Sequence, residues 1–331
     1  MKNNKFTPSY ISLYESGELE RRANILKSRL VKCDICPRNC SINRFESKKG
    51  FCRSGHLVSI ASYCDHHGEE PVISGSRGSG TIFFRNCNLK CVYCQNCQIS
   101  QGEYASSDEI DSLTLANIMV DLQNETGCHN VNLVSPSHFV PQIVEAVCHA
   151  VPSGLKIPLV YNTNAYDAMP TLKLLDGIID IYLPDIKYAS NVWAFKCSNV
   201  KNYVELSRMA IKEMYRQVGN LVTDNSGVAQ KGLIVRHLIL PNNLAGSGDS
   251  LKWLAMQVSR DVTVSIMSQY YPCHLANKEP LLSRKINTGE FREVVEIVEE
   301  LGLGNGWLQE TDSAEHYLPD FDRDGHPFRL I

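Results

Sequence analysis

Six short apolar runs, separated by stretches with helical spacing, constrain the fold of this 331-residue chain more than any other feature. The runs cover residues 81–84, 130–134, 157–162, 178–183, 232–240 and 262–267. In the first long intervening stretch, Leu115, Met119 and Leu122 recur at the spacing of one helical face. Apolar strands that alternate with amphipathic helices are typical of a parallel sheet covered by helices. The sequence therefore predicts an α/β fold.

Four more stripes with helical spacing lie at residues 143–147, 210–218, 251–258 and 294–301. Six strands with such helices fit either a partial barrel or a doubly wound sheet. A dinucleotide-binding sheet would carry a G-x-G-x-x-G segment directly after a strand, with an acidic residue about 20 positions further on. The chain has no such segment, and its GSRGSG stretch precedes a strand. We therefore do not expect a nucleotide-binding Rossmann domain.

The chain divides into three parts by the character of its sequence. Residues 1–80 combine a polar helical arm, ESGELERRANILKSRL, with a loop-rich module that has many cysteines and glycines. Residues 81–285 carry the alternating strands and helices, and residues 286–331 carry a helix and a tail. In the tail, Asp320, Asp322 and Asp324 have the spacing that opens a calcium-binding loop, but Ile331 stands where that loop needs a glutamate. We therefore predict a docked or solvated tail without calcium.

Cysteine is unusually frequent, with 13 in the chain. The first twenty residues lack the apolar stretch of a secretory signal, and no apolar run approaches the roughly 18 residues of a membrane span. Disulfides are therefore a poorer explanation than metal binding or thiol chemistry. We expect a cytoplasmic protein with no membrane partner. The formal net charge of −3 gives no reason to expect a broad nucleic-acid surface.

Cys87, Cys91 and Cys94 follow the first predicted strand in a C-x3-C-x2-C pattern. Iron–sulfur clusters usually take four cysteines, so three thiolates on one short loop suit a 4Fe–4S cluster whose fourth iron has no protein ligand. A structural zinc site is the alternative, because Cys97 would supply a fourth thiolate. The spacing of the three cysteines favours the cluster.

A second group of cysteines lies in the loop-rich module, namely Cys33, Cys36, Cys40 and Cys52. Four thiolates within twenty residues are able to surround a zinc ion or to hold a second cluster. Either would cross-link loops that have few apolar residues of their own. Cys64 with His66 and His67 is an alternative set of ligands, although paired histidines beside a GEE segment are more often surface groups. The sequence leaves the identity of this metal open.

The segment FFRNCNLKCVYCQN resembles the cluster loop of radical S-adenosylmethionine (SAM) enzymes, including an aromatic residue, Tyr93, directly before the third cysteine. Other segments resemble the PflX-like branch of that superfamily, which contains relatives of pyruvate formate-lyase activating enzymes. These segments are CDICPRNC, HGEEPVISG, NLVSPSHFVPQI, VYNTN, DIYLPDIKY, VRHLILP, MSQYYP and YLPDFDRDGHPF. The resemblance thus extends along nearly the whole chain.

This resemblance implies a partial (β/α)6 TIM-type barrel with a loop-rich, cysteine-containing N-terminal extension and a 4Fe–4S cluster at the open end. SAM would bind the unique iron through its amino and carboxylate groups. One-electron reduction would split SAM into methionine and a 5′-deoxyadenosyl radical, which abstracts hydrogen from a substrate. The protein orients the cofactor and excludes water and oxygen. We expect an oxidoreductase that works in a reducing, low-oxygen cytoplasm.

Polar residues follow several of the predicted strands, and functional groups of parallel barrels gather at the carboxyl ends of the strands. Asn162 and Asp185 would hold ribose hydroxyls. Arg236 interrupts an apolar strand and either faces the SAM carboxylate or forms a structural ion pair. The GGE segment of activating enzymes is replaced by VSPSH, so Ser135 or backbone groups would contact the SAM amino group. The residues predicted to contact SAM are Tyr93, Ser135, Asn162, Asp185, Lys187, Arg236 and Gln269.

Two classes of function fit these patterns. The first is a radical SAM enzyme that is reduced by a carrier such as flavodoxin or ferredoxin. Installing a glycyl radical on a partner protein is one activity within it, and peptides, small molecules and RNA are other substrates. The second is a non-enzymatic iron–sulfur or zinc protein for electron transfer or redox sensing. The three-cysteine spacing and an α/β body larger than an electron carrier needs favour the enzyme.

Overall fold

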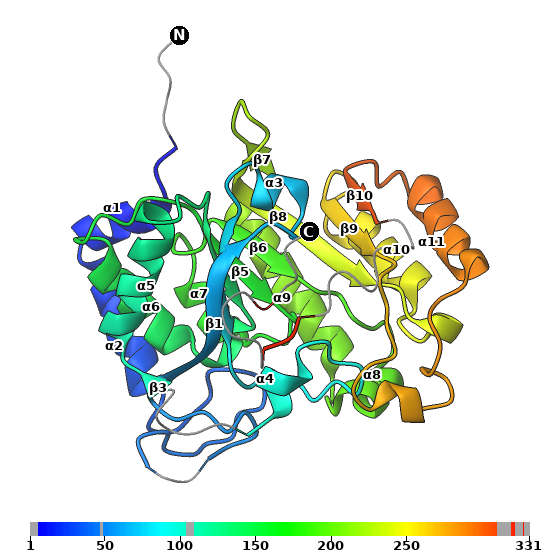
Figure 1. Cartoon of the computed structure of the whole chain (residues 1–331), viewed down its shortest axis with the longest axis horizontal. Coiled ribbons are helices and arrows are strands. Elements are labelled where there is room, and N and C mark those ends of the chain that lie inside the picture. The colour runs from blue at the N-terminus through cyan, green and yellow to red at the C-terminus, as the bar shows by residue number, and fades with distance from the viewer. Residues whose placement is uncertain (1–5, 47–48, 104–108, 310–318, 322–326, 328–331) are drawn as a thin grey trace.

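The computed structural model describes residues 6–46, 49–103, 109–309, 319–321 and 327. Among these residues, the centre of the molecule is one ten-stranded sheet with helices packed around it (Figure 1). The strand order is β10-β9-β8-β6-β5-β4-β2-β1-β3, and β7 pairs with β8. The strands are β1 (Val58–His66), β2 (Ser79–Phe84), β3 (Glu109–Ile110), β4 (Val131–Val134), β5 (Leu159–Thr163), β6 (Ile181–Pro184), β7 (Val222–Thr223), β8 (Ala229–Leu238), β9 (Thr263–Met267) and β10 (Gly306–Leu308). The structure thus confirms the predicted α/β class.

The six predicted apolar runs are all strands, and they form β2, β4, β5, β6, β8 and β9. Each of these strands pairs in parallel with the next one in the sequence. The order therefore advances in one direction and lacks the reversal that defines a doubly wound sheet. Because neighbouring parallel strands point the same way, their carboxyl ends lie along one edge of the sheet.

The five predicted helical stripes are also confirmed, and they form α5, α6, α9, α10 and α11. Asp111 caps α5 by accepting a hydrogen bond from the backbone of Thr114, and Asn287 and Glu290 form a capping box at the start of α11. The helices are α1 (Ser9–Glu15), α2 (Glu18–Ser28), α3 (Pro71–Ser74), α4 (Cys97–Gln101), α5 (Ser112–Asn124), α6 (Val140–Ala150), α7 (Met169–Leu174), α8 (Asn191–Ser198), α9 (Tyr203–Val218), α10 (Ser247–Gln257) and α11 (Thr288–Leu301).

Strand β1 corrects one expectation from the sequence. Its residues were expected to belong to a loop-rich module, but they pair antiparallel with β2 and extend the central sheet. The buried residue Val58 begins a strand whose other face is half-exposed, as at an outer position of a sheet. The predicted domain boundary after residue 80 falls inside β2, because β1 and β2 are hydrogen-bonded along their length.

The N-terminal helices α1 and α2 lie against the helices that cover the sheet, beside α5 and α6 in Figure 1. Tyr10, Leu19 and Leu26 are fully buried in the same core as the apolar residues of α5 and α6. The Tyr10 hydroxyl donates a 2.8 Å hydrogen bond to the backbone carbonyl of Ile157. The predicted helical arm therefore packs as an integral layer of the α/β body.

The C-terminal part of the chain adds a strand to the predicted helix and tail, because β10 pairs in parallel with β9. Asp320 and Phe321 are described, whereas Asp322, Asp324 and Ile331 of the calcium-like segment lie outside the described residues. The Phe321 amide donates to the side chain of Gln98, and its ring packs edge-on against Phe83. This part of the tail is docked. Within the described chain, no helix has the length and apolar character needed to cross a bilayer.

Candidate active site

A cavity of about 1360 Å³, its mouth included, lies at the carboxyl ends of the parallel strands. Ser135 directly follows β4, Asn162 lies at the end of β5, and Asp185 directly follows β6. The cavity wall includes the three cysteines of the C-x3-C-x2-C pattern and every residue predicted to contact SAM. These residues are Cys87, Cys91, Cys94, Tyr93, Ser135, Asn162, Asp185, Lys187, Arg236 and Gln269. The fold thus brings these ten residues together, whereas Cys33, Cys36, Cys40 and Cys52 do not line this cavity.

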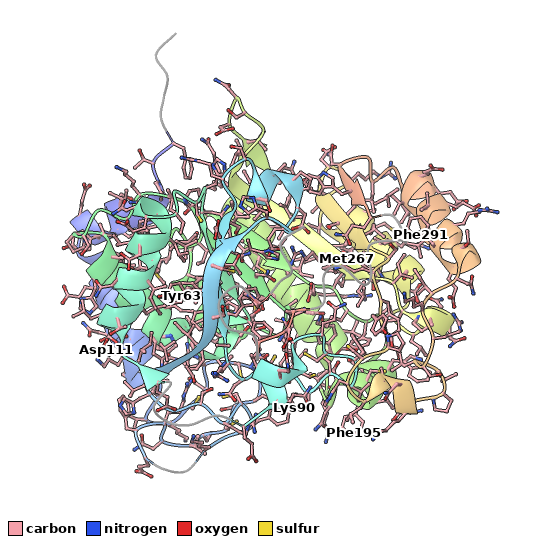
Figure 2. All side chains as sticks on the ribbon, in the orientation of Figure 1. Tyr63, Lys90, Asp111, Phe195, Met267 and Phe291 are labelled. Carbon is pink, nitrogen blue, oxygen red and sulfur yellow. The ribbon has the colours of Figure 1, made fainter. Side chains whose placement is uncertain are left out.

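The cysteine loop leaves β2 through Asn86, which has a left-handed backbone conformation with φ of 68°. Asparagine adopts this conformation more readily than most residues, so it suits a sharp turn out of a strand. The loop is then held against the end of α8 by two backbone hydrogen bonds, in which Lys90 and Val92 donate to the carbonyls of Ser198 and Cys197. Figure 2 labels Lys90 in this loop, close to α4, and Met267 at the end of β9.

Each of the three sulfur atoms has a polar neighbour from elsewhere in the site. Asn164 donates its side-chain amide to the Cys87 sulfur over 3.4 Å. Ser198 donates its hydroxyl to the Cys91 sulfur over 2.9 Å. The Cys94 sulfur lies 3.2 Å from the hydroxyl of Ser100 in α4. Hydrogen bonds to ligating sulfur atoms are a means by which proteins adjust the potential of an iron–sulfur cluster.

A chain of hydroxyl groups continues from the cysteine loop into the protein. The Tyr93 and Tyr188 hydroxyls are 2.6 Å apart, and the Tyr188 hydroxyl is 2.6 Å from that of Ser198, which donates to the Cys91 sulfur. Tyr93, predicted to contact SAM, therefore points its hydroxyl into this buried chain. Tyr93 nevertheless lines the cavity. Sequence reasoning missed Ser198, because it lies more than one hundred positions after Cys91 and belongs to no local pattern.

Burial raises the pKa of the Cys87 thiol to about 11, with a further contribution from neighbouring Cys91. Burial also raises the pKa of Cys91 and of Cys94. A metal must therefore displace protons from these thiols when it binds. Within the described part of the chain, no group of three or more histidine, cysteine or acidic side chains is arranged to hold a metal ion. Both predicted metal sites stay predictions.

Asp185 and Lys187, two of the predicted SAM contacts, form an ion pair with a distance of 2.6 Å between Nζ and Oδ2. Burial alone would lower the pKa of Lys187, but the adjacent Asp185 carboxylate holds it well above its ordinary value. Lys187 therefore stays charged and engages Asp185. The Tyr203 hydroxyl, which donates to the backbone around Asn164 and Asp185, fixes the loop that carries this pair.

The guanidinium of Arg236 forms a largely buried ion pair, which is one of the two alternatives that the sequence left open. Its Nε and Nη2 atoms donate to the two carboxylate oxygens of Glu70 over 2.7 and 2.6 Å, and Nη2 also contacts Glu69. Asn132 in turn donates its amide to Glu69 over 3.0 Å. The paired histidines beside the GEE segment were interpreted as surface groups, but His66 is buried and lines the cavity together with both glutamates.

Two cavity side chains carry buried carbonyl oxygens that have no hydrogen-bond partner in the described part of the chain. They belong to Gln269, which follows β9, and to Gln309, which follows β10. A buried unpaired acceptor is costly unless a bound molecule or water satisfies it. The two amides therefore offer acceptors to the donor groups of a ligand. Gln309 was not predicted, because β10 itself was not recognised in the sequence.

The chain is similar to two proteins from Methanocaldococcus jannaschii. No family model matches the chain. The Methanocaldococcus jannaschii protein named "Uncharacterized protein MJ0674" is 29% identical over 292 residues, which is 86% of this chain and 79% of that protein. "Uncharacterized protein MJ0808" from the same organism is 23% identical over 218 residues, or 60% of this chain and 63% of that protein.

Among solved structures, the chain is similar to Streptococcus suis SuiB bound to S-adenosylmethionine, with a TM-score of 0.46 and 12% sequence identity. The match covers 72% of this chain and 52% of SuiB, so the chain spans about half the length of that protein.

Proposed function

We propose that this protein is a radical SAM enzyme, in which Cys87, Cys91 and Cys94 ligate a 4Fe–4S cluster and the surrounding cavity binds SAM. The observation that carries the proposal is the cavity itself. It combines three partly buried thiols from one short loop with polar side chains from the ends of the parallel strands. Functional groups of parallel α/β folds gather at this edge. We further propose that the sheet corresponds to a partial (β/α)6 barrel.

The donor atoms around the cavity fit a cluster with one open iron. Three cysteines supply three thiolates, and each sulfur has a hydroxyl or amide neighbour that would compensate its negative charge. When bound, the cluster supplies the electron that breaks a carbon–sulfur bond of SAM. The chain's own task is to hold the reactants in place and to keep water away from them. The two backbone hydrogen bonds that attach the cysteine loop to α8 suit that task.

The side chains that remain available in the cavity suggest how SAM is held. Gln269 and Gln309 present unpaired carbonyl oxygens that would accept hydrogen bonds from amino or hydroxyl groups. Ser135 and Asn162 line the same cavity and would hold polar groups of the cofactor. Arg236 is engaged by two glutamates, so we assign it to the cavity wall and not to the SAM carboxylate.

The partners of the reaction follow from this proposal. A low-potential one-electron carrier, such as flavodoxin or ferredoxin, would reduce the cluster. The substrate would be a molecule with an unreactive C–H bond, and a glycyl-radical enzyme is one candidate of this kind. A reducing, low-oxygen cytoplasm is the compartment in which an accessible cluster would survive.

The test is SAM cleavage under anaerobic conditions. After reconstitution with iron and sulfide, we expect the protein to convert SAM to 5′-deoxyadenosine and methionine when dithionite is added, as measured by liquid chromatography and mass spectrometry. Replacing Cys87, Cys91 and Cys94 together with alanine should abolish this product. Cys148→Ala in α6 is the matched control and should leave it unchanged, because Cys148 does not line the cavity. Equal deoxyadenosine formation by the triple variant would refute the proposal.

The same measurement separates the enzyme from an electron carrier. A carrier would show an intact cluster by absorbance but no deoxyadenosine at any SAM concentration. It would also have a coordinatively complete cluster, whose electron paramagnetic resonance (EPR) spectrum does not respond to SAM. A spectrum that changes when SAM is added would support an open iron.

A further inference from the structure

Three buried hydroxyl groups form a chain that ends on a sulfur atom of the cysteine loop. They belong to Tyr93, Tyr188 and Ser198, which are 6%, 1% and 0% exposed. The Tyr93 and Tyr188 hydroxyls are 2.6 Å apart, and the Tyr188 hydroxyl is 2.6 Å from that of Ser198. Ser198 donates to the Cys91 sulfur over 2.9 Å. Because Tyr93 lines the cavity, this hydroxyl chain runs from the cavity wall to the sulfur.

The direction of every hydrogen bond in the hydroxyl chain is fixed, because each hydroxyl has a single proton to donate. Ser198 uses its proton on the Cys91 sulfur. The proton between Tyr188 and Ser198 must therefore come from Tyr188, and the proton between the two tyrosines must come from Tyr93. Hydrogen bonds in such a chain polarise one another. The donation to the sulfur is therefore stronger than that of a serine hydroxyl without a donor behind it.

Ser198 is the last residue of α8, where a serine hydroxyl has competing acceptors. Serine side chains in helices commonly donate to the backbone carbonyl three or four positions earlier. For Ser198 these are the carbonyls of Phe195 and Ala194, which accept from the backbone of Asn199. The Ser198 hydroxyl donates to the sulfur instead. Tyr188 donates to its oxygen and thereby opposes its rotation toward the helix.

Ser198 also binds the cysteine loop through its backbone, because its carbonyl accepts a 3.1 Å hydrogen bond from the amide of Lys90. The preceding carbonyl, that of Cys197, accepts from the amide of Val92 over 2.8 Å. The backbone on either side of Cys91 is thus attached to the end of α8. This attachment sets the distance between the hydroxyl and the sulfur, and only the direction of the hydroxyl is left to be fixed.

Tyr188 is held firmly enough to fix that direction. The next residue, Ala189, donates a backbone hydrogen bond to the Ala245 carbonyl over 2.9 Å. The Tyr188 ring packs edge-on against the ring of Tyr203, with the ring centres 5.5 Å apart. The Tyr203 hydroxyl in turn accepts a 3.0 Å hydrogen bond from the amide of Lys187. Backbone and ring contacts together therefore determine where the Tyr188 hydroxyl lies.

We propose that Tyr188 is a positioning residue for the cluster, which holds the Ser198 hydroxyl on the Cys91 sulfur and so raises the reduction potential. Tyr188 does not line the cavity, so it acts through Ser198. The proposal rests on the proposed function, because it requires a cluster at Cys87, Cys91 and Cys94. Reduction adds one negative charge to the cluster, so a donor to a ligating sulfur stabilises the reduced state more than the oxidised state.

Breaking the hydroxyl chain should lower the reduction potential. At the wild-type midpoint, Ser198→Ala should reduce the ratio of reduced to oxidised cluster about fivefold, which is about 40 mV at about 59 mV per tenfold. Tyr188→Phe keeps the Ser198 hydroxyl but allows it to turn toward α8 for part of the time. It should therefore reduce the ratio about twofold, or by about 18 mV. Redox titration followed by EPR measures both potentials.

The decisive variant combines the two substitutions. Without the Ser198 hydroxyl, Tyr188 has nothing to position, so the double variant should have the same potential as Ser198→Ala alone. A further drop in the double variant, or an unchanged potential in Tyr188→Phe, would overturn the proposal. Tyr10→Phe is the matched control. It removes an equally buried hydroxyl, which donates to the Ile157 carbonyl from α1, and should leave the potential unchanged.

A second measurement does not need the cluster. Before reconstitution, urea unfolding of the full chain gives the costs of Tyr188→Phe, Ser198→Ala and the double variant. The two single costs should not add, because the substitutions remove the two partners of one hydrogen bond. Additive costs would overturn the positioning role even where the potentials shift.

These outcomes separate the role of Tyr188 from the proposed function. If the variants form deoxyadenosine but share the wild-type potential, Tyr188 has no positioning role and the radical SAM function stands. If the wild type assembles a cluster but forms no deoxyadenosine, the radical SAM function fails, and the potentials still decide the role of Tyr188. A wild type that assembles no cluster would overturn both.

Discussion

Replacing Glu70 with glutamine should destabilise the protein, because it removes one of the two carboxylates that pair with the largely buried Arg236. The side chain of Glu70 is only 4% exposed and that of Arg236 is 14% exposed. Their two hydrogen bonds, 2.7 and 2.6 Å long, form a bidentate pair that joins the segment before α3 to β8. Loss of Glu70 leaves Arg236 with Glu69 as its remaining carboxylate partner among the described residues.

The magnitude follows from this geometry. Breaking a buried ion pair by removing one partner costs about 3–5 kcal/mol in the free energy of unfolding. Glu69 still contacts Arg236 in the variant, so we expect Glu70→Gln to cost about 3 kcal/mol, at the lower end of that range. Lys27→Gln is the matched control. It breaks the ion pair with Glu145, in which the lysine is 51% exposed, and should cost less than about 1 kcal/mol.

The assay is urea unfolding followed by circular dichroism, for Glu70→Gln, Arg236→Met and the double variant. The two single costs should not add, because Glu70 and Arg236 are direct partners and both single variants break the same pair. Glu70 is buried, which opposes ionisation, but Arg236 outweighs burial and lowers the pKa of Glu70. The stabilisation is therefore present above the pKa of Glu70 in the unfolded chain and is lost as pH falls through its lower pKa in the folded protein.

One result would refute this reasoning. If Glu70→Gln and Arg236→Met left the free energy of unfolding unchanged while Arg236→Met weakened SAM binding, measured by calorimetry, Arg236 would be a cofactor ligand. The ion pair would then have no structural role.

Three further predictions test other parts of the structure. Ser198→Ala removes the hydrogen bond to the Cys91 sulfur and should lower the reduction potential of the proposed cluster by about 40 mV. Redox titration followed by EPR measures this potential. An unchanged potential would show that the Ser198 hydroxyl does not adjust it. Burial raises the pKa of Asp180 to about 7, so the free energy of unfolding should fall by up to about 4 kcal/mol as pH rises from 4 to 8. Asp180→Asn should remove this pH dependence. If the free energy of unfolding changed with pH equally in Asp180→Asn and in the wild type, Asp180 would not be its cause. Gly232→Ala should lower the free energy of unfolding by at least about 2 kcal/mol, because φ at this position is 129° and an added methyl group would meet backbone 2.4 Å away. Gly227→Ala, where the added methyl group would meet no other atom, should lower it less. Thermal unfolding of the two variants measures the difference.

The sequence by itself determined the α/β class, the six central strands and the five helical stripes. It did so because apolar residues repeat with the periods of strands and helices, and those periods are local properties of the chain. It also indicated which residues would share a cavity. Ser135, Asn162 and Asp185 each stand at the end of an apolar run, and parallel strands bring such ends to one edge.

Only the tertiary structure decided which side chains become partners. Arg236 meets Glu70, 166 positions earlier in the sequence, and Ser198 reaches the sulfur of Cys91, 107 positions earlier. Strand β1 likewise joins the sheet although its surroundings in the sequence have the character of a loop. Hydrogen bonds and ion pairs of this kind depend on the distance between atoms that folding brings together, and no local periodicity records that distance.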